Sequence, residues 1–328
     1  MLKYILKRLV YVAFVFFIIS IIMFVLYKFV PGDPALMMID SSKQNVDPVR
    51  FEQMYQAARE RLGLDKPLPI QYISWITNML TGDFGYSSQY RMPVKDMVSA
   101  PLMNTLQMNL ASMVLVFLIS IPLGIVTAVR KNGIFDNTVQ VTSVVGYSLP
   151  GFVIALLCIF AFAVKLPIFP ISGVNTAGMT GTSMELFLDK MHHMALPVIV
   201  TTLSSIGMIT RYVRGAMIDV LEMDYIRTAR AKGLREKVVV YVHAFRNALI
   251  PIITIMTSWI VTLFSGSVVI ERLFLWNGLG NVLYTALMQR DFMVVLTMQM
   301  FYVVLALVGN LIMDLTYCLV DPRVKLEN

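Results

Sequence analysis

Long apolar stretches, separated by charged or Pro- and Gly-rich segments, are the main pattern along this chain. A helix needs about 20 mostly apolar residues to cross the roughly 30 Å hydrocarbon core of a bilayer. Lipid offers no partners to backbone polar groups, so each stretch of this length is expected to be helical. The six predicted spans are 9–30, 102–129, 139–164, 194–213, 249–270 and 296–320.

The segment 31–101, between the first two predicted spans, is long enough to fold as a small helical cap. Asp47 as N-cap, Pro48 in the first turn and Gly63 as a stop predict an amphipathic helix over 48–62. A second helix is expected at 69–80, and both are expected to pack over the outer mouth of the protein. The expected organisation is an N-terminal segment 1–8, a first span 9–30, the cap 31–101, a core of transmembrane helices 102–320 with a connecting loop 214–248, and a C-terminal segment 321–328.

Composition agrees with a membrane protein, because 57% of the residues are hydrophobic, only 14% are charged and the mean hydropathy is +0.72. Lys and Arg accumulate on the cytoplasmic side of membrane proteins. If the N-terminus is cytoplasmic, the whole net charge of +7 falls on that side. We therefore expect a multi-pass protein of the cell membrane with both termini in the cytoplasm. Membrane topology alone explains the basic balance, so binding of nucleic acid is not expected.

Two groups of hydroxyl side chains interrupt the predicted spans. Hydroxyls that face hydrocarbon lack hydrogen-bond partners, so such groups are expected to face protein or water. They form either contacts between helices or the lining of a transport pathway, and the pattern leaves both readings open. These candidate pathway residues are Ser143 and Tyr147 in the third span, and Thr254, Ser258 and Thr262 in the fifth.

The sequence offers little chemistry for other classes of membrane protein. No span carries a pair of ionisable residues at its middle, which argues against an ion-coupled carrier. His192 and His193 are adjacent and do not share the i, i+4 spacing of a helical metal motif. No phosphate-binding loop of the type G-x-x-x-x-G-K-[ST] is present, so the chain lacks this means of holding nucleotide phosphates. We expect no catalytic, cofactor-binding or metal-binding residue on this chain.

The segment 223–234, between the fourth and fifth spans, predicts a short helix. Asp224 can cap its first amides, and Gly233 can adopt the left-handed conformation that ends it. A helix of about 12 Å is too short to be stable alone in water, so other protein must hold it. Its apolar face therefore rests either on the chain's own helix ends or on a partner subunit.

Several motifs in a fixed order resemble the permease subunits of binding-protein-dependent ATP-binding-cassette (ABC) importers, in their dipeptide, oligopeptide and nickel branch. The resemblance extends over nearly the whole chain. Its motifs are PGDP at 31–34, LGLDKPLPIQY at 62–72, GDFGYS at 82–87, YSLPGF at 147–152, HMALP at 193–197, DYIRTARAKGL at 224–234, FRNALIP at 245–251, GLGN at 278–281 and DPR at 321–323.

The resemblance implies an all-α fold of six transmembrane helices, like that of type I ABC importer permeases, and a role in peptide import. It implies as partners a paralogous permease, two ATPase subunits that carry ATP and Mg²⁺, and an extracytoplasmic substrate-binding protein. Arg227 stands where many such permeases carry Glu, so no Glu contact is carried over. The alternatives are a nickel permease of the same branch and an ATP-independent carrier or channel. The ATPase-docking residues implied are Tyr225, Ile226, Thr228, Ala229, Ala231, Gly233 and Leu234.

Overall fold

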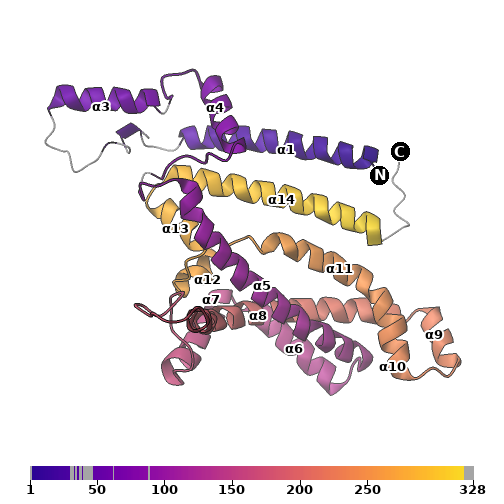
Figure 1. The fold of residues 1–328 in the computed structure, drawn as a ribbon. Helices are drawn as coiled ribbons and strands as arrows, with labels where there is room; N and C mark the ends of the chain where they lie inside the picture. Colours follow the sequence, from indigo (N-terminus) through magenta and orange to yellow (C-terminus); the bar gives the residue numbers. More distant parts are fainter. Residues whose placement is uncertain are drawn as a thin grey trace. The chain divides into compact units, whose positions relative to one another are not determined.

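The structure is a computed structural model that describes residues 2–29, 33, 35–36, 39, 47–61, 63–87 and 89–320. The expected C-terminal segment 321–328, with its motif at 321–323, lies outside the described residues, as do most of 30–46. Within the described ranges all regular secondary structure is helical (Figure 1). The elements are α1 (Leu2–Phe29), α3 (Pro48–Arg61), α4 (Leu68–Leu80), α5 (Val94–Val129), α6 (Ile134–Ser148), α7 (Gly151–Cys158), η2 (Ile159–Lys165), α8 (Ser183–Leu221), α9 (Asp224–Ala231), α10 (Glu236–Val238), η3 (Val239–Ala244), α11 (Phe245–Thr262), α12 (Val268–Leu273), α13 (Leu279–Met288) and α14 (Phe292–Val320).

Five described helical stretches are long and apolar enough to cross a membrane, and a bent pair of helices makes up to six. The predicted fold class, a helical protein that spans the membrane several times, is confirmed. The stretches are Ile5–Phe29, Val94–Val129, Ser183–Leu221, Glu236–Thr262 and Phe292–Met313, with the pair Ile134–Ser148 and Gly151–Lys165 bent by 100°.

The third predicted span, 139–164, is not one straight helix. Leu149 and Pro150 adopt extended backbone angles (ψ 130° and 136°), which separate α6 from α7. A proline disfavours the helical conformation in the residue before it, so the chain leaves the helix at Leu149. The apolar pattern continues through this break, and for that reason it predicted a single span.

The fifth span ends at Thr262, earlier than the predicted residue 270. The chain turns after Leu263, and Ser267 then begins the separate helix α12 by accepting a hydrogen bond from the Ile270 amide at 3.3 Å. Several other helices begin well before their predicted spans, for example α5 at Val94 and α8 at Ser183. Their first turns are more polar than the apolar window that predicted them.

The chain divides into two compact units, and the first comprises Met1–Ala100 and Val282–Leu307. The predicted helices 48–62 and 69–80 correspond to α3 and α4, and Gly63, the predicted stop, has a φ of +63°. Ser87 and Asp291, from different ends of this unit, are joined by a hydrogen bond of 2.5 Å from the serine hydroxyl to the carboxylate. Leu62 lies outside the described residues.

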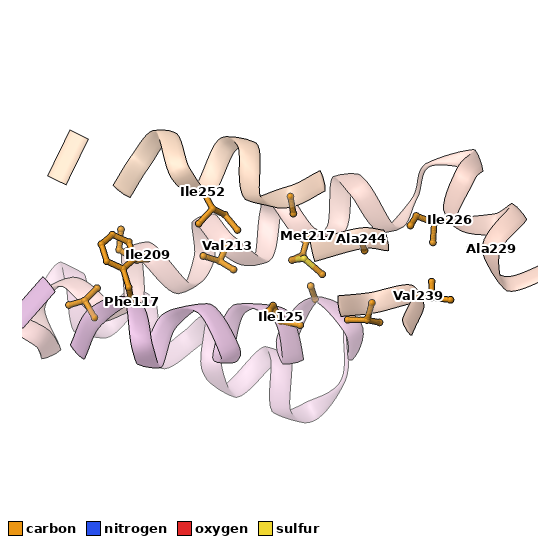
Figure 2. Close-up of a cluster of buried hydrophobic side chains, with 14 residues drawn as sticks. Phe117, Ile125, Ile209, Val213, Met217, Ile226, Ala229, Val239, Ala244 and Ile252 are labelled. Carbon is orange, nitrogen blue, oxygen red and sulfur yellow. The ribbon is translucent and has the colours of Figure 1, made fainter. Parts of the chain in front are cut away.

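The second unit comprises Pro101–Asn281 and Val308–Asn328. Figure 2 shows Val213 and Met217 of α8 beside Ile252 of α11 and Ile125 of α5, in one cluster of buried apolar side chains. Helices approach closely here: a β-carbon on Gly207 of α8 would lie 2.7 Å from the Ser143 carbonyl oxygen. A β-carbon on Gly309 of α14 would lie 1.9 Å from Cγ2 of Val261 in α11.

Candidate functional site

The short helix α9 connects the long helix α8 to the segment that leads into α11. Met223, with extended angles (φ −72°, ψ 148°), occupies the N-cap position, and no side chain caps the first amides. The prediction that Asp224 is the N-cap was therefore wrong, because the chain enters the helix one residue earlier. Asp224 lies in the first turn, where its negative charge interacts favourably with the helix dipole. The Nη1 atom of Arg227 lies 3.4 Å from the Oδ1 atom of Asp224.

The C-terminal end of α9 follows the predicted glycine motif. The Lys232 amide donates to the Thr228 carbonyl at 3.0 Å, and the Gly233 amide donates to the Arg230 carbonyl at 2.9 Å. Gly233 has φ +73°, a conformation that side chains with a β-carbon disfavour. The helix thus ends where the sequence predicted.

Two residues of α9 face the interior of the second unit. Ile226 is fully buried and Ala229 is 7% exposed. Both belong to the cluster that contains Met217 of α8, Val239 of η3 and Ala244, as Figure 2 shows. Ile226 and Ala229 therefore attach α9 to its own chain, and the ATPase contact that the resemblance implied for them stays a prediction.

The other predicted docking residues lie on the outer face of α9 and in the turn that follows. The Tyr225 side chain is 46% exposed and Leu234 is 40% exposed. Thr228, Ala231 and Gly233 are also exposed. The two alternatives read from the sequence thus apply to opposite faces: one face rests on the chain itself, and the other is accessible to a partner.

Two ion pairs hold the surroundings of α9 in place. Arg230 donates to both carboxylate oxygens of Glu236, at 2.7 and 3.2 Å, and so links α9 to α10. Lys131, in the turn between α5 and α6, donates at 2.7 Å to Glu222, the C-cap of α8, two residues before α9. The Lys131 ammonium group holds the pKa of Glu222 below its ordinary value. Both pairs are exposed to solvent, so each contributes little to stability by itself.

A third pair, Asp136 and Arg214, is buried and was missed by sequence reasoning. Arg214 of α8 donates from Nε and Nη2 to the two carboxylate oxygens of Asp136 in α6, each at 2.6 Å. The Asn132 amide donates to the same carboxylate at 2.9 Å. Such two-point pairs fix orientation as well as distance. The residues are 78 positions apart, so no local pattern could have paired them.

A cavity of about 520 Å³ lies within the second unit, among α5, α6, α7, η2 and α8. Its wall is mostly apolar, with Thr142, Ser143 and Thr210 as its hydroxyl side chains. The Thr210 hydroxyl is buried without a hydrogen-bond partner among the described residues. Of the predicted pathway residues, Ser143 alone lies in this wall.

The structure does not bring the other predicted pathway residues to the cavity. The Tyr147 hydroxyl accepts a hydrogen bond from Arg211 at 2.7 Å and its side chain is exposed. Thr254, Ser258 and Thr262 each donate to a backbone carbonyl of their own helix, at 2.7 to 3.2 Å. These bonds within the helix give each hydroxyl a partner without water or substrate. The spacing of hydroxyl residues in the sequence could therefore not distinguish contacts between helices from the lining of a pathway.

Glu271 of α12 organises a second polar cluster that sequence reasoning missed. Its buried carboxylate accepts hydrogen bonds from the Thr105 hydroxyl at 2.9 Å and from the Asn281 amide at 3.0 Å. A β-carbon on Gly278 would lie 2.6 Å from this carboxylate, so the GLGN turn fits closely around it. Burial raises the pKa of Glu271 despite these bonds. The GLGN motif at 278–281 was the only sequence signal noted for this cluster, but it did not indicate that the turn packs against Glu271.

Comparison with known proteins places these features in a family. The family described as "Binding-protein-dependent transport system inner membrane component" matches residues 120–326, and its N-terminal counterpart matches 1–108. The "Oligopeptide transport system permease protein AppB" of Bacillus subtilis is 41% identical over 94% of both chains. The "Di/tripeptide transport system permease protein DppB" of Pseudomonas aeruginosa and the "Dipeptide transport system permease protein DppB" of Escherichia coli are 36% and 34% identical over 99% of each chain.

Among solved structures, one of the MetNI methionine ABC transporter, in an inward-facing conformation, is similar with a TM-score of 0.49 and 18% identity. The match covers 67% of this chain and 96% of the other. The family match covers more than half of this chain, and the relatives match nearly all of it. This chain belongs to the family of inner membrane components of binding-protein-dependent transport systems.

Proposed function

We propose that this chain is a permease subunit of an ABC importer for peptides, in which it forms half of the translocation pathway. The relatives reported above are named for oligopeptides, di- and tripeptides or dipeptides, which supports peptides rather than nickel as the substrate. The observation that carries the mechanism is the two-faced helix α9, buried at Ile226 and Ala229 and exposed at Tyr225 and Leu234.

In this proposal α9 receives movement from an ATPase subunit through its exposed face. Its buried face belongs to the same apolar cluster as Met217 of α8 and Ile252 of α11, so a displacement of α9 displaces both helices. The pair between Asp136 and Arg214 attaches α6 to α8 and extends the moving group. Closely packed helices of this kind move as rigid elements rather than deform continuously.

The proposed partners are a paralogous permease, two ATPase subunits that hold ATP and Mg²⁺, and an extracytoplasmic substrate-binding protein. The family description supports a binding protein as partner. We place both termini and α9 in the cytoplasm, because that arrangement puts the whole net charge of +7 on the inner side. The catalytic groups for ATP hydrolysis belong to the ATPase subunits in this proposal.

The test is peptide uptake by the assembled transporter in lipid vesicles, with ATP enclosed on the α9 side and the binding protein on the other. We expect uptake of a labelled peptide that requires ATP and the binding protein. Uptake that continues without ATP would contradict an ABC importer and favour a carrier or channel. Uptake of nickel in place of peptide would leave the mechanism intact but overturn the substrate.

A pair of proline substitutions tests the role of α9. Proline cannot adopt the positive φ of Gly233 or of Gly178, which lies in the loop between η2 and α8 with φ +74°. We expect Gly233→Pro to abolish uptake and peptide-stimulated ATP hydrolysis in complexes that still assemble, whereas Gly178→Pro retains both. Uptake at the unmodified rate by assembled Gly233→Pro complexes would show that α9 does not transmit movement.

A further inference from the structure

Helix α4 packs against the second half of α1 through an aromatic cluster. The Tyr72 ring lies 5.5 Å from that of Phe24 and 6.2 Å from that of Phe17, measured between ring centroids. The Trp75 ring lies 5.7 Å from that of Phe24. The hydroxyl groups of Tyr72 and Ser20 are hydrogen-bonded at 2.7 Å. All of these residues belong to the first unit.

The partners of α4 on α1 give its position along α1 relative to Lys28. Lys28 is the last charged residue of α1, and its ammonium group donates to the Gln71 side chain. At about 1.5 Å per residue, Phe24 lies roughly 6 Å from Lys28 along the helix axis, and Ser20 lies roughly 12 Å from it. Because α1 is a membrane span, α4 crosses it about one helical turn inside the level of Lys28. Amphipathic helices at bilayer surfaces bury their apolar faces to this depth of about 5–10 Å.

The side of α4 that faces away from its α1 contacts is uncovered, and apart from Ser74 and Thr77 its central residues are apolar. Ile70, Ile73 and Leu80 are 49%, 59% and 71% exposed, and helical spacing places them on one face. No charged residue occurs in Leu68–Leu80, whereas Lys66 precedes the helix and Asp83 follows it. By contrast, α3 contains Arg50, Glu52, Arg59, Glu60 and Arg61. The two loop helices therefore suit different surroundings.

We propose that α4 lies in the boundary between lipid headgroups and acyl chains, with Ile70, Ile73 and Leu80 in contact with lipid. The neighbouring helix α1 also has exposed apolar side chains, which include Phe14, Ile21 and Val25, so the surroundings of α4 suit lipid. Tyr and Trp are enriched at this level of the bilayer, which agrees with Tyr72 and Trp75. This placement replaces the expectation that the helix at 69–80 covers the outer mouth, and it does not depend on the proposed substrate.

Spin labels on single cysteines test this placement in the full chain. Cys158 and Cys318 are first replaced by alanine, and Ile73→Cys or Leu80→Cys then carries a nitroxide label in phosphatidylcholine–phosphatidylglycerol vesicles. Collisions are measured with oxygen, which concentrates in lipid, and with a water-soluble nickel chelate. Matched controls are Asn78→Cys, exposed on the opposite side of α4, and Gln56→Cys, exposed on α3.

We expect oxygen collisions at positions 73 and 80 to exceed nickel collisions several-fold, and the ratio to reverse at positions 78 and 56. Frequent nickel collisions at 73 and 80 would place this face in water and overturn the proposal. Low collision rates with both reagents would show that protein covers the face. Measurement on the chain alone and on the assembled transporter identifies that protein as the chain itself or as a partner.

Discussion

Asp136 has no exposed surface, and the guanidinium group of Arg214 donates a hydrogen bond to each of its carboxylate oxygens. The free energy of such a pair is small when both partners are present, since burial costs each charge its hydration. Removal of one partner should not have the same effect as removal of the other. Arg214 remains 20% exposed and can reach water, whereas Asp136 cannot. Loss of the arginine should therefore be more harmful than loss of the acid.

We expect Arg214→Ala to lower the free energy of unfolding by about 3 kcal/mol or more, because a buried carboxylate loses its partner. Asp136→Asn should cost less, since a neutral amide still accepts a hydrogen bond. Thermal unfolding of the purified protein in detergent measures both effects. Lys131→Ala, which breaks the exposed pair with Glu222, is the control and should cost at most about 1 kcal/mol. Equal losses for all three variants would contradict this account.

Glu271 predicts a dependence of stability on pH. Burial raises its pKa above the ordinary value of 4.5, so the folded protein holds this proton more tightly than the unfolded chain does. The stabilisation is complete below the ordinary pKa and is lost as pH rises through the raised one. We expect the melting temperature to fall over this range.

Glu271→Gln should flatten that profile, because the variant does not titrate. It should also lower stability at acid pH by about 1 kcal/mol, since the amide cannot accept both of the hydrogen bonds that Thr105 and Asn281 donate. The exposed Glu52→Gln is the control and should leave the profile unchanged. An unchanged slope in Glu271→Gln would assign the pH dependence to other groups.

At the scale of single residues, the sequence predicted backbone conformations better than contacts between side chains. The left-handed Gly233 was predicted because its residue type identifies this conformation at the end of a helix. The partners of Asp136 and Glu271 were not, since each pair joins segments far apart in the chain. Hydroxyl side chains in apolar helices were ambiguous for another reason. A serine or threonine can satisfy itself on the preceding turn, as Thr254 does, and the sequence does not reveal this choice.

At the scale of the element, α9 has two faces with different consequences for function. The buried face attaches the helix to its own chain, and the exposed face is available for contact with a partner. Its short length means that it has little stability of its own. Substitutions on the two faces should therefore separate stability from coupling.

We expect Tyr225→Asp and Leu234→Asp to leave the melting temperature nearly unchanged but to reduce co-purification of the ATPase subunits at least tenfold. Both side chains are exposed, so the added charge is hydrated in the isolated chain and desolvated in a contact. Ile226→Ala should instead lower the free energy of unfolding by about 2–4 kcal/mol, because it removes a fully buried side chain. ATPase binding that survives both aspartate substitutions would place the contact elsewhere.

The apolar pattern predicted which long helices are present, but it did not predict where a helix breaks. Helices α3, α4 and α9 lie close to their predicted positions because proline and glycine mark their ends. The break at Pro150 was harder to predict, since a proline within a span can also kink a continuous helix. The two π-helical segments, η2 and η3, have no clear sequence signal.

At the scale of the whole molecule, the bent pair α6 and α7 decides the topology. If the pair crosses the membrane as one broken span, the chain has six crossings and its termini lie on the same side. If the pair enters and leaves on one side, the chain has five crossings and opposite termini. The charge pattern of the sequence favours six, because it places all of the net charge inside.

We expect reporter fusions at both ends of the chain to report the same, cytoplasmic side. An alkaline phosphatase fusion should be inactive at either terminus, and a fluorescent protein fusion should be bright at both. A phosphatase fusion in the loop 166–182, after the bent pair, provides the internal control and should be active. An active phosphatase at one terminus alone would show that α6 and α7 form a re-entrant loop.

The close contact between α14 and α11 restricts how this molecule can diverge. A side chain at position 309 would overlap Val261, whose branched β-carbon leaves it few alternative rotamers. A larger residue at 309 is therefore accessible only after 261 has become smaller, whereas shrinkage at 261 is tolerated with glycine still in place. The two changes are expected to be fixed in that order along any lineage. Homologues should accordingly include chains with small residues at both positions, but not chains with large residues at both.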